Sequence, residues 1–265
     1  MGLGMKYIDV HAHIFPPAIA GKVVEQLEHY YGFHWEGNGL VEDLLDSMDR
    51  NGIGRTVVFS SATKPAQVES INRYIAGVCA AHPDRFIGFG TMHREYRDFR
   101  AELGRMREMG LKGLKFHPDF QDFDIDDPAM MKIYEAAGPD MVLLFHVGDP
   151  KCEHSAPERL ARVLDALPGL RVIAAHMGGY SVWERARASL IGRDVWLDTS
   201  SCLPHLDVAE MARLAREHGP DRLLFASDYP AVHHARAIAD VLALGLTAEE
   251  QEKVFLRNAE ALLGL

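Results

Sequence analysis

The sequence has 265 residues, of which 48% are hydrophobic and 25% are charged, a composition typical of soluble globular proteins. Its formal net charge of −10 argues against nucleic acid or an anionic membrane surface as the main partner, because both attract basic patches. The length matches the roughly 250 residues of one (β/α)8 barrel, so we expect a single domain over residues 1–265.

The three cysteines, Cys79, Cys152 and Cys202, are far apart and form no CxxC pair, which predicts reduced thiols and a cytoplasmic protein. The opening MGLGMKYIDV does not have the pattern of a secretory signal. The longest apolar runs have about five residues, and a membrane-spanning helix needs roughly 20. We therefore expect no membrane partner.

Short apolar segments rich in β-branched and aromatic residues alternate with longer segments along the whole chain. Eight of them are predicted strands, in chain order 7–14, 56–60, 86–91, 113–116, 141–147, 171–176, 195–199 and 223–227. The spacing between them leaves room for one helix and two loops each time. Strand and helix alternation of this kind predicts a parallel sheet.

The intervening segments have helical periodicity. Residues 41–51 place Val41, Leu44, Leu45 and Met48 on one face, and Gly52 is a plausible stop. Further helices are predicted from Pro157 to the Pro168-Gly169 pair, from Asp207 as N-cap to His218, and over 249–263.

An open doubly wound sheet is the alternative to a closed barrel. Such sheets often carry a glycine-rich phosphate loop after the first strand. Here the first strand is followed by the sequence IFPP, which has no glycine. We therefore predict an α/β fold, a single (β/α)8 TIM barrel of the metal-dependent hydrolase type.

Ionisable residues recur at the carboxyl ends of the predicted strands, where barrel enzymes have their active sites. The chain has 14 histidines, and several of them fall at these positions. His11 and His13 are two apart and face the same side of the first strand. Four or five apolar residues lead up to each of His146, His176 and Asp228.

Burying ionisable groups at several strand ends is costly unless they are paired or bind a metal. Converging histidine and aspartate side chains suit Zn²⁺ or a similar cation, with an open position for water. Lys115 and His117 at the fourth strand are weaker candidates, for binding a substrate carboxylate or for shaping the loop. His93 is a further weak candidate, and Asp198 could face either side of its strand. We expect the remaining histidines to be solvated: His29, His34, His82, His154, His205, His218, His233 and His234.

Five motifs together resemble the amidohydrolase superfamily. They are DVHAHI, GLKGLKFHPDFQ, LLFHVGD, VIAAHMGG and LLFASDYP. More narrowly, they are similar to the amidohydrolase-related branch, which includes aminocarboxymuconate-semialdehyde decarboxylase, resorcylate-type decarboxylases and lactone hydrolases. The resemblance extends from the first strand to the last.

The resemblance implies a distorted barrel with one divalent metal ion, usually zinc, with manganese as the other candidate. It implies that His11, His13, His146 and Asp228 are the metal ligands. His176 would polarise the substrate or position water. The setting of Lys115 is that of the mononuclear branch, so we do not expect a carboxylated lysine.

The first functional hypothesis is hydrolysis of a small lactone, ester or amide that carries a carboxylate. Metal-activated water would attack the carbonyl, Asp228 would transfer the proton, and His176 would stabilise the oxyanion. The alternative is non-oxidative decarboxylation of an aromatic or muconate-type acid on the same site, and a third possibility is a non-catalytic metal-binding barrel. Short loops favour hydrolysis.

The segment 18–39 is rich in aromatic residues and follows the first strand. Tyr30, Tyr31, Phe33 and Trp35 in it are expected to pack, to cover the site or to contact a second subunit of a homodimer.

Overall fold

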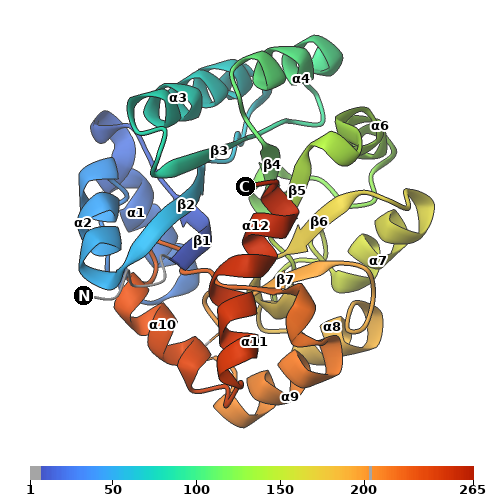
Figure 1. Cartoon of the computed structure of the whole chain (residues 1–265). Helices are drawn as coiled ribbons and strands as arrows, with labels where there is room; N and C mark the ends of the chain where they lie inside the picture. Colours follow the sequence, from blue (N-terminus) through green and yellow to red (C-terminus); the bar gives the residue numbers. More distant parts are fainter. Residues whose placement is uncertain (1–6, 203–204) are drawn as a thin grey trace.

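The computed structural model describes residues 7–202 and 205–265. Eight parallel strands follow one another around the sheet in chain order, with helices on the outside (Figure 1). The strands are β1 (Tyr7–His13), β2 (Ile53–Phe59), β3 (Phe86–Gly90), β4 (Gly113–Phe116), β5 (Val142–Phe145), β6 (Arg171–Ala174), β7 (Trp196–Asp198) and β8 (Leu223–Leu224). All eight predicted strands are present.

The sheet closes between its first and last strands. The amide of Val10 donates to the carbonyl of Phe225 at 3.1 Å, and Ala12 forms a parallel bridge with Tyr229. The fold is therefore the predicted (β/α)8 barrel, and the doubly wound alternative is excluded because an open sheet has two free edges.

Helices follow the strands along the chain, and most of them pack against the outside of the barrel. They are α1 (Pro17–Tyr31), α2 (Val41–Asn51), α3 (Val68–Ala81), α4 (Phe99–Glu108), α5 (Pro118–Gln121), α6 (Pro128–Ala137), α7 (Pro157–Ala166), α8 (Trp183–Ser189), α9 (Val208–His218), α10 (His234–Leu242), α11 (Ala248–Glu252) and α12 (Asn258–Leu263). A π-helical turn, Lys253–Arg257, joins α11 to α12.

Local signals in the sequence set several boundaries as predicted. Helix α2 ends where Gly52 adopts a left-handed conformation with φ 70°, and its amide donates to the carbonyl of Met48. The carboxylate of Asp207 accepts the amide hydrogen of Ala209 and caps α9. Strand ends were less accurate: β8 has two residues, and His176 lies beyond β6 in a 3-10 turn, His176–Gly178.

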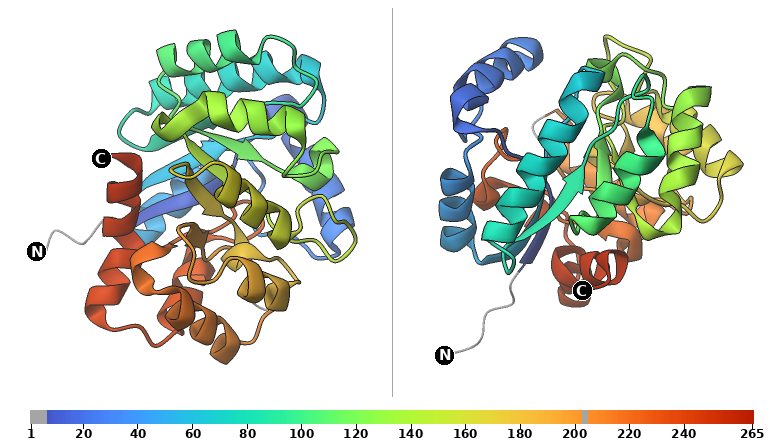
Figure 2. Two further views of the ribbon diagram at one scale, coloured as in Figure 1. Left: turned by 90° about the vertical axis from the view of Figure 1, so that its right-hand side faces the viewer. Right: turned by 90° about the horizontal axis from the view of Figure 1, so that it is seen from above.

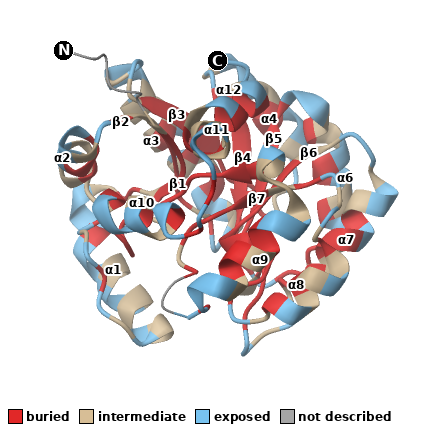
Figure 3. Cartoon of the chain, turned by 60° about the horizontal axis from the view of Figure 1, so that its bottom comes forward, coloured by how far each residue is buried: buried red, intermediate tan, exposed pale blue. Residues whose placement is uncertain are grey.

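Two apolar layers support the barrel, one inside it and one between strands and helices. The strands at the centre of the molecule are largely buried (Figure 3). The inner layer includes Val10, Phe59 and Leu144 and is continued by Leu262 and Leu263 of α12. Helix α12 therefore closes the amino-terminal end of the barrel.

Helix α1 lies at the opposite end of the molecule from α12 (Figure 2). The carboxyl-terminal ends of the strands, where the sequence places its ionisable residues, therefore open on the side of α1. Among the residues that the structure describes, none of the helices has the length and apolar character needed to span a bilayer.

Candidate active site

An irregularity in β1 directs its two histidines into the barrel. Ile8 and Val10 belong to the inner apolar layer, so simple alternation would turn His11 outward. The register between β1 and β2 shifts between Asp9 and Ala12, and a bulge of this kind re-aims the side chains that follow it. His11 consequently faces the barrel interior, as predicted.

His11, His13 and Asp228 form a compact group of potential metal ligands. The two Nε2 atoms of the histidines are 3.2 Å apart, and Asp228 Oδ1 lies 3.1 Å from His11 Nε2 and 3.5 Å from His13 Nε2. A tetrahedral zinc ion about 2.1 Å from each ligand would set the ligand atoms about 3.4 Å apart. The donor atoms and their spacing fit one divalent cation.

The hydrogen bonds of His11 leave the correct nitrogen free for a cation. Its Nδ1 lies 2.8 Å from Asp198 Oδ2, and because a carboxylate can only accept, Nδ1 is the donor. In the neutral form of His11 the lone pair therefore lies on Nε2, facing His13 and Asp228. A carboxylate behind a ligating histidine is a common feature of metal sites. Asp198 thus faces inward, which the sequence had left open.

The charges around this group change the pKa values of its members. Burial lowers the pKa of His11, but Asp198 and Asp228 outweigh burial and raise it above 6.5. Burial lowers the pKa of His13 to about 4. His11 also brings the pKa of Asp228 well below its usual value, against the effect of burial. At neutral pH the group therefore contains a carboxylate and a neutral His13.

Lys115 is fully buried behind the candidate metal ligands. Its Nζ lies 3.1 Å from His11 Nε2 and 5.0 Å from the centre of the Phe59 ring, and burial lowers its pKa to about 8. The ammonium and a bound cation would use the same lone pair of His11, so the two interactions exclude one another. Lys115 is not among the residues that line the cavity.

His146 and His176 contact one another beside this group. His176 Nε2 lies 3.0 Å from His146 Nδ1, and His176 Nδ1 lies 3.1 Å from the carbonyl oxygen of Ser200. The predicted ligand His146 falls into a second potential ligand group, with His117 and Asp119. Its ring stacks on His117 at 4.0 Å with an interplanar angle of 11°, so the lone pairs of the two rings lie in nearly parallel planes.

His176 and Asp228 share an unusual backbone conformation. Their φ angles are 58° and 63°, in the left-handed region that non-glycine residues rarely adopt. Hydrogen bonds hold both: the amide of His176 donates to Asp198 Oδ1 at 2.9 Å, and the amide of Asp228 donates to the carbonyl of His11 at 2.9 Å. Such conformations cluster at functional sites.

His234 is buried, contrary to the expectation that it would be solvated. Its Nε2 donates to Asp9 Oδ2 at 3.0 Å, and its Nδ1 accepts from Ser47 Oγ at 2.8 Å. Asp9 also accepts the amide hydrogens of His11 and Ser227, at 2.9 and 3.0 Å. The position of His234 at the start of α10 did not indicate its burial, because its partners Asp9 and Ser47 are distant in sequence.

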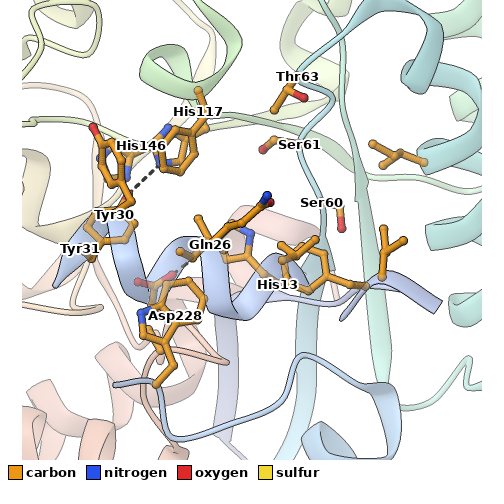
Figure 4. A pocket seen from close by; sticks show the side chains of 18 of the residues that line it. His13, Gln26, Tyr30, Tyr31, Ser60, Ser61, Thr63, His117, His146 and Asp228 are labelled. Carbon is orange, nitrogen blue, oxygen red and sulfur yellow. Dashed lines mark hydrogen bonds and ion pairs between the residues drawn. The ribbon is translucent and has the colours of Figure 1, made fainter. Parts of the chain in front are cut away.

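The candidate ligands open into a cavity of about 610 Å³ (Figure 4). His13, His117, His146, His176 and Asp228 line its inner end. Aromatic side chains form much of the remaining wall, among them Phe15, Tyr30, Tyr31, Phe33, Trp35, Phe120 and Tyr180. The aromatic segment 18–39 is therefore part of the wall of this cavity.

Two tyrosines at the end of α1 tie this segment to the barrel. Tyr30 Oη donates to Asp149 Oδ2 at 2.9 Å, and Tyr31 Oη lies 3.0 Å from His117 Nε2. Both partners follow strands, β5 and β4 respectively. Helix α1 therefore crosses from the end of β1 to the opposite side of the barrel mouth, and His117 contacts the wall of the cavity.

Three solved structures similar to this chain share its fold. One is an uncharacterized TIM-barrel protein from Bordetella bronchiseptica, with 21% identity, a TM-score of 0.80, and coverage of 98% of this chain and 99% of that one. The 2,6-dihydroxybenzoate decarboxylase from Rhizobium has 18% identity, a TM-score of 0.73 and 98% coverage of both chains. The 5-carboxyvanillate decarboxylase from Novosphingobium aromaticivorans, complexed with manganese, has 20% identity, a TM-score of 0.71, and coverage of 99% and 97%.

The family comparison covers almost the whole chain. The model of the family described as amidohydrolase matches residues 8–265, from β1 to the end of the chain. This range includes every candidate ligand and the whole of the cavity wall described above. The chain therefore belongs to the amidohydrolase family, as the strand-end motifs had indicated.

Proposed function

We propose that the protein is a metal-dependent decarboxylase of an aromatic acid. The observation that carries the proposal is the opening of the His11, His13 and Asp228 group into a cavity with aromatic walls. A flat ring between aromatic side chains gains apolar burial and stacking, while its acid group reaches the candidate ligands. Similar folds that decarboxylate aromatic acids support the proposal.

The residues of this chain would divide the work between binding and proton transfer. A divalent cation held by His11, His13, Asp228 and, as the resemblance implies, His146 would supply a Lewis acid for the carboxylate and a neighbouring oxygen. Tyr31 and Tyr180 would orient the ring. When the bond from ring to carboxylate breaks, its electron pair stays on the ring carbon and carbon dioxide leaves.

The ring carbon must then receive a proton. We assign this transfer to Asp228, which lines the cavity and accepts a hydrogen bond from Ser201 Oγ at 2.7 Å. As a carboxylate it would first take up a proton from solvent water and then pass that proton to the ring carbon. His176, whose pKa burial lowers to about 4, is neutral at physiological pH. Because its Nδ1 donates to the Ser200 carbonyl, its Nε2 carries the lone pair and would accept a hydrogen bond from a substrate hydroxyl group. Asp228→Asn should abolish turnover while retaining much of the metal.

Hydrolysis is the second candidate, because the same ligand group also suits activation of water. The sequence favoured it on the ground that the loops are short. That argument is weaker once α1 and residues 32–40 are seen to wall the barrel mouth. An aromatic cavity favours a ring over a small lactone.

One experiment separates the two chemistries. The protein, loaded with manganese or zinc, is incubated with hydroxybenzoic acids labelled with ¹³C in the carboxyl group, and separately with a panel of lactones and esters. We expect labelled carbon dioxide from at least one acid, and none from the double variant His11→Ala/His13→Ala. Acid release from a lactone without any carbon dioxide would instead assign hydrolysis.

A further inference from the structure

The cavity is larger than one aromatic acid requires. Its volume is about 610 Å³, whereas a cavity of about 150 Å³ accommodates benzene. The candidate ligands occupy one end only. The rest of the cavity lies away from the candidate ligands, and the side chains that line it indicate which chemical groups it can bind.

Two helices face each other across this distal part of the cavity. From α1, Ile19, Val23, Leu27 and Tyr30 line the cavity, which is one face of a helix. From α3 and the turn before it, the lining residues have the same helical spacing: Gln67, Ser70, Ile71 and Tyr74. Gln26 and Thr63 mark the two sides in Figure 4.

Helix α1 leaves part of its apolar face unburied by protein. Ala20 is its one fully buried residue, and Ile19 is 47% exposed. Val23 and Leu27 are half-buried and turn towards the cavity. A ligand in the distal cavity would bury this apolar face of α1, and an apolar ligand group would match it.

The distal walls carry no formal charge. Lys22, Glu25 and Glu28 of α1 and Glu69 and Arg73 of α3 are absent from the cavity lining, as are all Lys and Arg residues within the described part of the chain. The polar groups present are neutral amides and hydroxyls such as Gln26, Gln67 and Ser70. A charged substituent would lose its hydration here without gaining a partner.

We propose that the space between α1 and α3 is a subsite for an uncharged, mainly apolar substituent. The substrate is then an acid whose ring carries an alkyl or aryl extension of several carbons. The identity of the acid end rests on the proposed decarboxylase function, but the subsite itself follows from the cavity walls. Val23 of α1 and Ile71 of α3, which both line it, determine the specificity.

The test is calorimetric binding to the manganese-loaded protein. One series is salicylate and its 4-ethyl, 4-butyl and 4-hexyl derivatives; the other is phenol and the matching 3-alkylphenols, which lack the carboxylate. We expect the Kd to fall about three- to fourfold per methylene in both series. A terminal carboxylate on the hexyl chain should weaken binding at least tenfold. A Kd that does not change with chain length overturns the subsite.

Two variants localise the effect. Val23→Trp fills the subsite. It should remove the gain in affinity from the hexyl chain while leaving the Kd of salicylate unchanged. Val23→Thr keeps the size of the side chain and should reduce the gain in affinity.

Leu242→Trp, at a 48% exposed position of α10, is the matched control and should retain the full gain in affinity. Equal losses for salicylate and its hexyl derivative in Val23→Trp would contradict the proposed location.

The two proposals fail separately. A chain-length gradient in the alkylphenols without carbon dioxide release from any acid would leave the subsite standing and refute the decarboxylase. Turnover of hydroxybenzoates without a dependence of the Kd on chain length in either series would support the decarboxylase and refute the subsite.

Discussion

Individual side chains at the strand ends have unequal places in the candidate metal site. His11, His13 and Asp228 lie within 3.1–3.5 Å of one another, whereas both nitrogens of His146 already have partners in His176 and Gly148. The sequence treats these residues alike, because each lies at the carboxyl end of a predicted strand. Only the contacts in the structure distinguish His146 from the other three residues.

This difference predicts the order in which alanine variants lose metal. His11→Ala and His13→Ala each remove a nitrogen that faces the cluster and should release nearly all bound manganese or zinc. His146→Ala should lower metal content less, because its nitrogens are held by other groups. Elemental mass spectrometry of the three purified variants measures this. Full retention in His13→Ala would refute the proposed ligand group.

Asp198 acts on the site through His11. Its carboxylate accepts from His11 Nδ1 at 2.8 Å and fixes the tautomer that leaves Nε2 unprotonated. Removing such a partner usually weakens metal binding by about 10- to 100-fold. We expect this loss for Asp198→Ala in a competition assay with a chelator. Asp149→Ala, which removes the acceptor of Tyr30, is the control and should leave metal affinity unchanged.

At the level of elements, the site depends on the junction of β1, β8 and α10. Asp9 on β1 accepts from Ser227 after β8 and from His234 on α10. The same carboxylate holds the amide of His11. The closure of the barrel and the placement of His11 and Asp228 are therefore coupled.

Substitution at Asp9 should consequently reduce both stability and metal binding. Asp9→Ala would leave the buried donors of His11, Ser227 and His234 without an acceptor, at about 1–3 kcal/mol each, so we expect it to lower the free energy of unfolding by about 3 kcal/mol or more. Ser47→Ala removes one hydrogen bond to His234 and should cost about 1 kcal/mol. Urea denaturation of the two variants measures the difference. Equal effects would show that Asp9 has no special role in the junction.

For the whole molecule, the buried histidines make folding sensitive to acid. Burial lowers the pKa of His13 and His176 from 6.5 to about 4, and it lowers those of His117 and His146 well below 6.5. The unfolded chain binds these protons at a pH near 6.5, and the folded chain does not. The raised pKa values of His11, Asp119 and Asp240 act in the opposite direction. Because the pKa values of His93 and His218 are lowered as well, six groups oppose three.

Stability of the metal-free protein should therefore fall as the pH drops from 6.5 to about 4. Each histidine contributes at most about 1.4 kcal/mol per pH unit within this window. The urea midpoint at several pH values measures the slope, and His176→Asn should make it shallower. A constant midpoint across the window would show that these histidines are not buried in neutral form.

The fold was predictable because its signals are local. Eight apolar segments separated by helical periodicity define a (β/α)8 barrel, and caps such as Asp207 and Gly52 set helix ends without reference to the rest of the chain. Strand ends were less predictable. Phe225 to Ser227 look like a continuation of β8, but their backbone groups bond to β1 and to side chains instead.

The sequence by itself also determined which residues meet at the barrel mouth, because the carboxyl ends of parallel strands must converge there. Only the tertiary structure decided their partners. Asp198 supports His11, His234 is buried against Asp9, and α1 forms one wall of the cavity. These contacts join residues separated by up to 225 positions, and no local pattern encodes a distance between such residues until the barrel has closed.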